Sequence, residues 1–232
     1  MSLRYDAICF DLFHTLVDVG SVPEAVGAMT ADVLEVDSAQ WNAACFGPQH
    51  DICEVTDHLQ VVKKMAHSID QNISQDRIEE ATRSRQARFD YALSQIEDEI
   101  VDQLQYLREQ GVKTVLVSNA SSGEVAAWQE SPLAACFDEV IFSCDCGMAK
   151  PDPGIYQLAL DKLGVSADKT LFVGDGGSCE HEGARAAGLS PVLMKRFTGD
   201  SLPAEELRLR AMFADYEIHQ IHDLQAIVQP LN

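Results

Sequence analysis

The sequence predicts a doubly wound α/β fold, a parallel sheet with helices on both faces, interrupted once near its start by a small all-α insertion. Two observations predict it. Apolar runs of strand length alternate with helical segments through the second half of the chain. Between about residues 18 and 95, apolar residues instead recur at spacings of three and four, with no convincing strand. We therefore expect a core domain of residues 1–17 and 96–232 and a helical domain of residues 18–95.

The first strand is expected at residues 5–10, a short buried run that ends at Asp11. Helical patterns in the insertion cover residues 22–33, 52–66 and 75–93. They predict a small helical bundle.

Strand and helix then alternate, and glycines mark several helix ends. The expected elements are a helix at 99–110, strands at 114–117 and 139–142, a helix at 153–163, a strand at 170–173, a helix at 180–187, strands at 191–194 and 216–219, and a helix from Asp223. This alternation is what a parallel sheet with crossover helices requires.

The chain is strongly acidic, with 37 Asp and Glu against 17 Lys and Arg and a net charge of −20. Such a field repels nucleic acid and anionic membranes, so neither is an expected partner. The sequence has no apolar run of membrane-spanning length and no secretory pattern, and we expect a cytoplasmic protein. A site for an anionic small molecule would need local positive charge. The oligomeric state is left open.

Polar residues follow the ends of several expected strands. Asp11, Ser118 and Asp175 each end or follow a strand, and Lys150 lies in a later loop. The carboxyl ends of parallel strands meet at one edge of a sheet, where ligands bind. These side chains are therefore expected to converge.

Four blocks, in order and spacing, resemble the motifs of the haloacid dehalogenase (HAD) superfamily and span nearly the whole chain. They are Asp11 to Leu16, Ser118-Asn119, Lys150 to Tyr156, and Gly174 to Ala184. The resemblance implies a Rossmann-like HAD core, a helical cap over the site, and hydrolysis of a small substrate through a covalent intermediate on an aspartate.

The resemblance also implies roles for individual residues. Asp11 would be the nucleophile, and Lys150 would hold Asp11 and the bound anion. The hydroxyls of Thr15 and Ser118 and the backbone amide of Asn119 would donate hydrogen bonds to substrate oxygens.

Magnesium is the cofactor that the fourth block implies. Asp175 and Glu180 would bind it with the Asp11 carboxylate and the backbone carbonyl of Phe13. Carboxylate and carbonyl oxygens are the ligands that Mg²⁺ prefers.

Phe13 departs from the phosphatase pattern, in which the residue two after the nucleophile is a second Asp that protonates the leaving group. Phe cannot transfer a proton, so substrates with good leaving groups are expected. His14 is a candidate substitute acid, or else a turn residue.

Phe13 and Tyr156 also resemble positions of the 2-haloacid dehalogenases, where both would contact substrate. Those enzymes work without metal and have Ser and Asn in the fourth motif, where this chain has Asp175 and Glu180. We favour a Mg²⁺-dependent phosphatase. The alternatives are a metal-free dehalogenase and a non-catalytic member that binds a phosphorylated metabolite or a protein.

Several residues of the insertion are weaker candidates, each with an ordinary structural explanation. Arginines near its end would reach an anionic substrate or form surface ion pairs, two lysines are candidate Schiff-base residues, and two aromatic residues line the pocket or fill the core. They are Arg77, Arg83, Arg85, Arg88, Lys63, Lys64, Trp41 and Phe46.

Overall fold

A computed structural model describes residues 3–198 and 202–229 and contains, within those residues, one six-stranded sheet in the order β3-β2-β1-β4-β5-β6. The strands are β1 (Ala7–Phe10), β2 (Lys113–Ser118), β3 (Glu139–Phe142), β4 (Thr170–Gly174), β5 (Ser190–Met194) and β6 (Tyr216–Ile218). All neighbouring pairs are parallel. The doubly wound α/β fold predicted from the sequence is confirmed.

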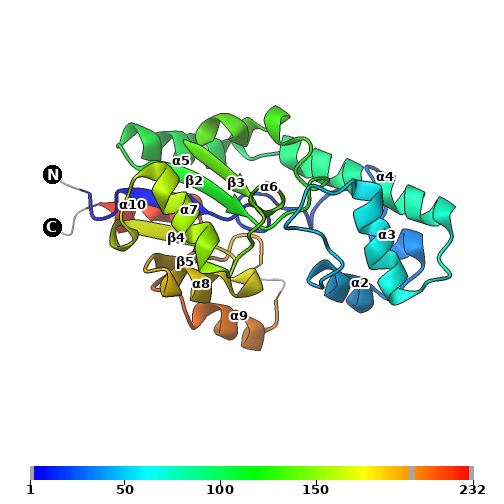
Figure 1. Cartoon of the computed structure of the whole chain (residues 1–232). Helices are drawn as coiled ribbons and strands as arrows, with labels where there is room; N and C mark the ends of the chain where they lie inside the picture. Colours follow the sequence, from blue (N-terminus) through cyan, green and yellow to red (C-terminus); the bar gives the residue numbers. More distant parts are fainter. Residues whose placement is uncertain (1–2, 199–201, 230–232) are drawn as a thin grey trace.

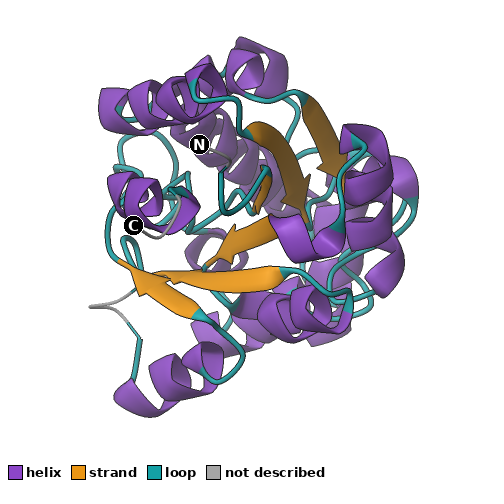
Figure 2. Cartoon of the chain, turned by 90° about the vertical axis from the view of Figure 1, so that its left-hand side faces the viewer, coloured by secondary structure: helices purple, strands orange, loops and turns teal. Residues whose placement is uncertain are grey.

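Helices cover both faces of the sheet (Figure 2). Side chains of β1 alternate between the faces: Ile8 and Phe10 pack in one hydrophobic cluster, and Ala7 and Cys9 in the other. The first cluster includes apolar residues of α5 (Asp98–Glu109) and α10 (Leu224–Val228), and the second includes those of α7 (Pro153–Leu163) and α8 (Glu180–Ala186). Two buried faces explain why the strands are continuous apolar runs.

Helices α1 (Thr30–Leu34), α2 (Ser38–Cys45), α3 (His58–Ile69) and α4 (Gln75–Ser94) form the insertion. They share a third hydrophobic cluster of their own and lie to one side of the sheet, away from both chain ends (Figure 1). Helix α4 is the longest and runs from this segment back to the sheet (Figure 1).

Two of the expected helices of the insertion begin later than predicted. The helix expected from residue 22 begins at Thr30, because residues 23–26 form a turn and Gly27, which follows it, packs against α4. A Cβ on Gly27 would lie 2.7 Å from the backbone oxygen of Ser84, and Arg88 of α4 donates to the Gly27 carbonyl at 2.9 Å. The helix expected from residue 52 begins at His58, where the Asp57 side chain caps the amide of Gln60.

The structure adds helices that the sequence patterns did not indicate, namely α2, α6 (Ser143–Cys146) and α9 (Ala204–Ala211). Helix α9 has no buried residue and α2 buries only Trp41, so neither carries an apolar stripe. No helix in the part of the chain that the structure describes is long and apolar enough to cross a membrane.

Candidate active site

The site lies at the carboxyl edge of the sheet. Asp11 directly follows β1 and Asp175 directly follows β4, and these strands are neighbours with Phe10 opposite Val173. Ser118 ends β2 on the other side of β1. Strand pairing thus brings together residues that are far apart in the sequence.

Lys150 lies at the centre of this group. Its Nζ donates to Asp11 Oδ1 at 2.5 Å and to Glu180 Oε2 at 2.7 Å. The Thr15 hydroxyl donates to the other Asp11 oxygen, Oδ2, at 2.8 Å. All four residues are buried, so these charged hydrogen bonds form away from bulk water.

Three buried carboxylates converge here: one oxygen from each of Asp11, Asp175 and Glu180 lies within 4.8 Å of the others. Backbone amides hold two of them, because Gly177 N donates to Asp175 Oδ1 and Gly176 N to Glu180 Oε1, each at 2.9 Å. A Cβ on Gly174 would lie 2.1 Å from Glu180 Oε1, so glycine before Asp175 leaves room for the Glu180 carboxylate in this position.

The ionisation of the cluster reflects this crowding. Burial, together with the charges of Asp11 and Asp175, raises the pKa of Glu180 to about 8, although Lys150 opposes the rise. Burial by itself would lower the pKa of Lys150, but the charges of Asp11 and Glu180 outweigh burial and raise it. Lys150 thus pairs with Asp11 and Glu180, and the third acidic group, Asp175, pairs with Arg210.

These residues fit a divalent cation. The oxygens of the three converging carboxylates are hard ligands of the kind that Mg²⁺ prefers, and Lys150 and Arg210 are the cations that pair with them in this structure. Asp11, Asp175 and Glu180 are the residues able to hold it.

Ser118 and Asn119 have different surroundings. The Ser118 hydroxyl is buried, has no hydrogen-bond partner within the described residues and is not among the residues that line the cleft, so its contact with substrate stays a prediction. The Asn119 side chain instead forms hydrogen bonds with the backbone amide and the backbone carbonyl of Lys150. Asn119 Nδ2 donates to the Lys150 carbonyl at 2.8 Å, and Asn119 Oδ1 accepts from the Lys150 amide at 2.7 Å.

Tyr156 lies behind the cluster. Its side chain is fully buried, and its hydroxyl donates to the backbone carbonyl of Glu180 at 2.8 Å. Tyr156 is not among the residues that line the cleft, so in this geometry it supports α8. Contact between Tyr156 and substrate stays a prediction.

A cleft of about 1500 Å³ opens above the cluster, between the helical segment and the sheet. Asp11, Lys150, Asp175 and Glu180 line its floor, and residues of the helical segment line the opposite wall. Phe13 and His14 line it as well. Phe13 packs edge-on against Phe89 of α4, with ring centroids 5.2 Å apart.

His14 occupies a left-handed backbone position with φ of 61°. Its amide donates to the Val17 carbonyl at 2.8 Å, which closes the loop after Asp11. Few non-glycine residues adopt this conformation, and histidine is among those that adopt it more often than most. A role as substitute acid stays a prediction.

Arg85, Glu124 and His50 form a buried cluster in the cleft wall; the sequence singled out Arg85 but not its two partners. Arg85 Nη2 lies 2.5 Å and His50 Nε2 lies 3.3 Å from Glu124 Oε1. Arg85 also lies over the rings of Trp41 and Phe89. Glu124 follows β2, whereas its two partners belong to the insertion, so the cluster ties the two parts together. Nothing in the local sequence around Glu124 marked this long-range pairing.

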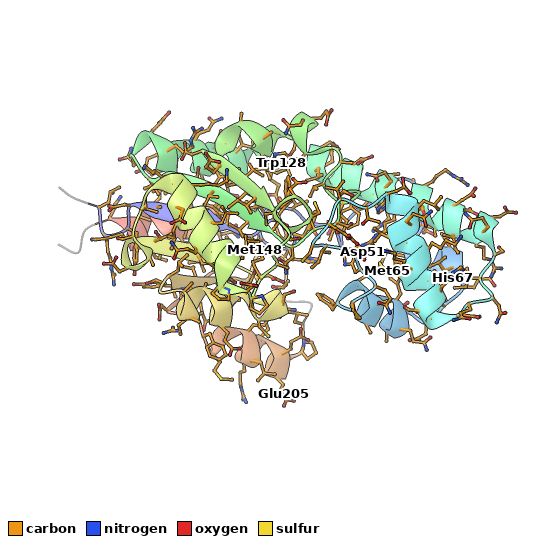
Figure 3. All side chains as sticks on the ribbon, viewed as in Figure 1. Asp51, Met65, His67, Trp128, Met148 and Glu205 are labelled. Carbon is orange, nitrogen blue, oxygen red and sulfur yellow. The ribbon has the colours of Figure 1, made fainter. Side chains whose placement is uncertain are left out.

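The other candidates of the insertion contact residues of the insertion, are exposed, or line the cleft, as Arg88 does. Arg77 pairs with Glu35, Arg88 donates to the carbonyls of Val22 and Gly27, and Arg83 is exposed. Lys63 donates to Gln75, and Lys64 pairs with Asp51, which lies between the helical segment and the sheet (Figure 3). Trp41 and Phe46 line the cleft, and Phe46 is 79% exposed.

The stabilisation that the His50–Glu124 contact provides between the insertion and the core is expected to depend on pH. Burial alone would lower the pKa of His50, but the Glu124 carboxylate outweighs burial and raises it. The folded state therefore binds the proton more tightly than the unfolded state, and this stabilisation is complete below the usual histidine pKa and is lost as pH rises through the raised value. His50→Gln is expected to lower the melting temperature by roughly 2–4 °C more at about pH 5.5 than at about pH 9.

Differential scanning calorimetry checks this, with His67→Gln as the matched control. His67 lies on α3, away from the cleft (Figure 3). A melting-temperature difference for His50→Gln that is the same at both pH values would show that the protonated His50–Glu124 pair does not stabilise the fold.

Comparison with known proteins shows the family of this chain but does not decide which of two reactions it catalyses. The (S)-2-haloacid dehalogenase 4A of Burkholderia cepacia is 30% identical over 184 residues, 74% of this chain and 74% of that protein. A phosphoglycolate phosphatase of Aliivibrio fischeri is 30% identical over 191 residues, 78% of this chain and 80% of that protein. Relatives at equal identity thus catalyse two different reactions.

The fold agrees with solved structures. A HAD-type protein of Bacillus subtilis, solved with bound magnesium, superposes with a TM-score of 0.67 at 20% identity and covers 97% of this chain and 98% of its own, which is a likeness of fold. The profile of haloacid dehalogenase-like hydrolases matches residues 5–188. The chain therefore belongs to the haloacid dehalogenase-like hydrolase family.

Proposed function

We propose that this hydrolase is a Mg²⁺-dependent phosphatase that acts on a small anionic substrate through a covalent intermediate on Asp11. The observation that carries the proposal is the buried convergence of Asp11, Asp175 and Glu180 around Lys150. One oxygen from each of these carboxylates lies within 4.8 Å of the others, a grouping of hard ligands that a bound Mg²⁺ would use.

In the first step a carboxylate oxygen of Asp11 attacks phosphorus, and the bond from phosphorus to the leaving-group oxygen breaks with its electron pair. Water then attacks the aspartyl phosphate and releases phosphate, which restores the carboxylate. Lys150 orients Asp11 through the 2.5 Å hydrogen bond. The unpartnered Ser118 hydroxyl is available to a phosphoryl oxygen.

Mg²⁺ held by Asp11, Asp175, Glu180 and the Phe13 carbonyl would neutralise charge between the nucleophile and the phosphoryl group. Phe13 places an apolar ring beside Phe89 where a proton donor would stand. The leaving group must therefore depart without help from that position, which favours acyl and aryl phosphates.

A metal-free 2-haloacid dehalogenase is the second candidate, and Phe13 favours it. A halide leaves without a proton, so the missing acid would cost nothing. The same Asp11 would attack carbon in place of phosphorus. The similarity to the Burkholderia dehalogenase supports this candidate to the same degree as the phosphatase relative supports the first.

Hydrolysis of p-nitrophenyl phosphate with Mg²⁺ and with EDTA tests the proposal. We expect p-nitrophenol release with Mg²⁺ and a fall of at least about a hundredfold with EDTA. Chloride release from 2-chloropropionate that persists in EDTA would establish the dehalogenase in its place. A phosphorylated metabolite that raises the melting temperature but is recovered unchanged would indicate the non-catalytic alternative.

A further inference from the structure

Arg210 reaches the fourth-motif carboxylate from a distant part of the chain. It lies on α9, the helix that carries the labelled Glu205 in Figure 3. Arg210 Nη1 lies 2.5 Å from Asp175 Oδ2 and 3.1 Å from the Asp175 backbone carbonyl. Its other nitrogen, Nη2, donates to Glu206 Oε1 at 2.8 Å. None of the sequence motifs includes this residue.

The local backbone is built to admit Arg210. Gly176 has φ of 82°, and a Cβ there would lie 2.8 Å from the Arg210 Cβ, so only glycine allows the helix to approach this closely. The Arg210 carbonyl lies 3.3 Å from His181 Nδ1 of α8. The arginine side chain is 17% exposed and that of Asp175 is 10% exposed. The ion pair is therefore enclosed, unlike the surface pairs of the helical segment.

Both oxygens of Asp175 are engaged by this arrangement. Oδ1 accepts from the Gly177 amide, and Oδ2 accepts from Arg210. A divalent cation bound to Asp175 must share or displace one of these donors. It must also approach a fixed guanidinium charge, and two like charges at short range repel strongly where water is largely excluded.

We propose that Arg210 is a positioning residue that competes with the divalent cation for Asp175 and so lowers the affinity of the site for Mg²⁺. Without metal, the guanidinium offsets the charge of Asp175 and holds it in place. With metal, Arg210 turns toward Glu206, its second partner. This inference rests on the proposed Mg²⁺ dependence of the site.

Isothermal titration of Mg²⁺ into the whole protein measures the effect without any substrate. Arg210→Gln is expected to lower the Mg²⁺ dissociation constant by at least about tenfold, because the competing charge is gone. Arg208→Gln is the matched control: Arg208 is an exposed arginine on the same helix, and its removal is expected to change the constant less than about twofold.

A second variant guards against loss of folding. The double variant with Arg210→Gln and Glu206→Gln removes both members of the Arg210–Glu206 ion pair and leaves the net charge of the protein unchanged. We expect it to bind Mg²⁺ as tightly as Arg210→Gln alone. Equal or weaker Mg²⁺ binding in a folded variant that lacks Arg210, including no detectable binding, would overturn the inference. Should the wild-type protein be an active Mg²⁺-dependent phosphatase with unchanged affinity in these variants, only the role of Arg210 fails. Tighter binding without any phosphatase activity would instead refute the proposed function alone.

Discussion

Replacing Asp11 by Asn is expected to lower the rate of p-nitrophenyl phosphate hydrolysis by at least about a thousandfold. An amide oxygen is a far weaker nucleophile than a carboxylate oxygen. Within the described residues, no other side chain both lines the cleft and accepts hydrogen bonds from Lys150 and Thr15. The fold is expected to persist, because Lys150 keeps its hydrogen bond to Glu180. Steady-state kinetics and a melting curve separate the two effects.

Asp6→Asn is the matched control for this substitution. Asp6 is exposed and precedes the same strand, β1, at its opposite end. The control is expected to hydrolyse the substrate at the wild-type rate. Retention of more than about a tenth of wild-type activity in Asp11→Asn would mean that hydrolysis proceeds without the aspartyl intermediate.

The sheet could be predicted because its strands follow a simple rule. Strands buried on both faces are continuous apolar runs, as in the four residues of β1, and helix ends such as Gly164 carry left-handed glycines. Because parallel strands all end at one edge of the sheet, residues at their carboxyl ends must converge. The sequence alone therefore suffices to place Asp11 and Asp175 together.

The remaining parts of the site depend on contacts that no local pattern encodes. Arg210 reaches Asp175 from a polar helix without buried residues, and Glu124 meets Arg85 across the two parts of the chain. The sequence motif assigns a role only to the backbone amide of Asn119, and nothing in it indicates that the Asn119 side chain holds the Lys150 backbone. Such pairings are decided by three-dimensional packing, which sequence spacing does not report.

The helix boundaries of the insertion differ from the prediction for a related reason. Apolar residues at helical spacing between residues 22 and 29 predict a helix, but Gly27 packs directly against the backbone of Ser84. Tertiary contact with α4 outweighs the local pattern there. Proline and glycine in the segment are the signals that favour a turn.

Phe13→Asp is expected to raise kcat/KM for a simple alkyl phosphate, such as glycerol 2-phosphate, by about a hundredfold or more. The substitution places a carboxylic acid in the loop after Asp11, at the position where Phe13 now lines the cleft. An alkoxide is a poor leaving group and gains most from protonation. An aryl phosphate departs readily without an acid, so its rate is expected to change much less.

Phe13→Ala is the control, because it also removes the contact with Phe89 but supplies no acid. The comparison of Phe13→Asp with Phe13→Ala therefore isolates proton transfer from the loss of packing. A new acid also predicts that the gain disappears as pH rises above the pKa of the introduced carboxyl. If the two variants hydrolyse the alkyl phosphate equally slowly across the pH range, the absence of an acid at this position is not what limits the enzyme. The preference for good leaving groups would then have to come from the cleft wall, which Arg85 and Trp41 line.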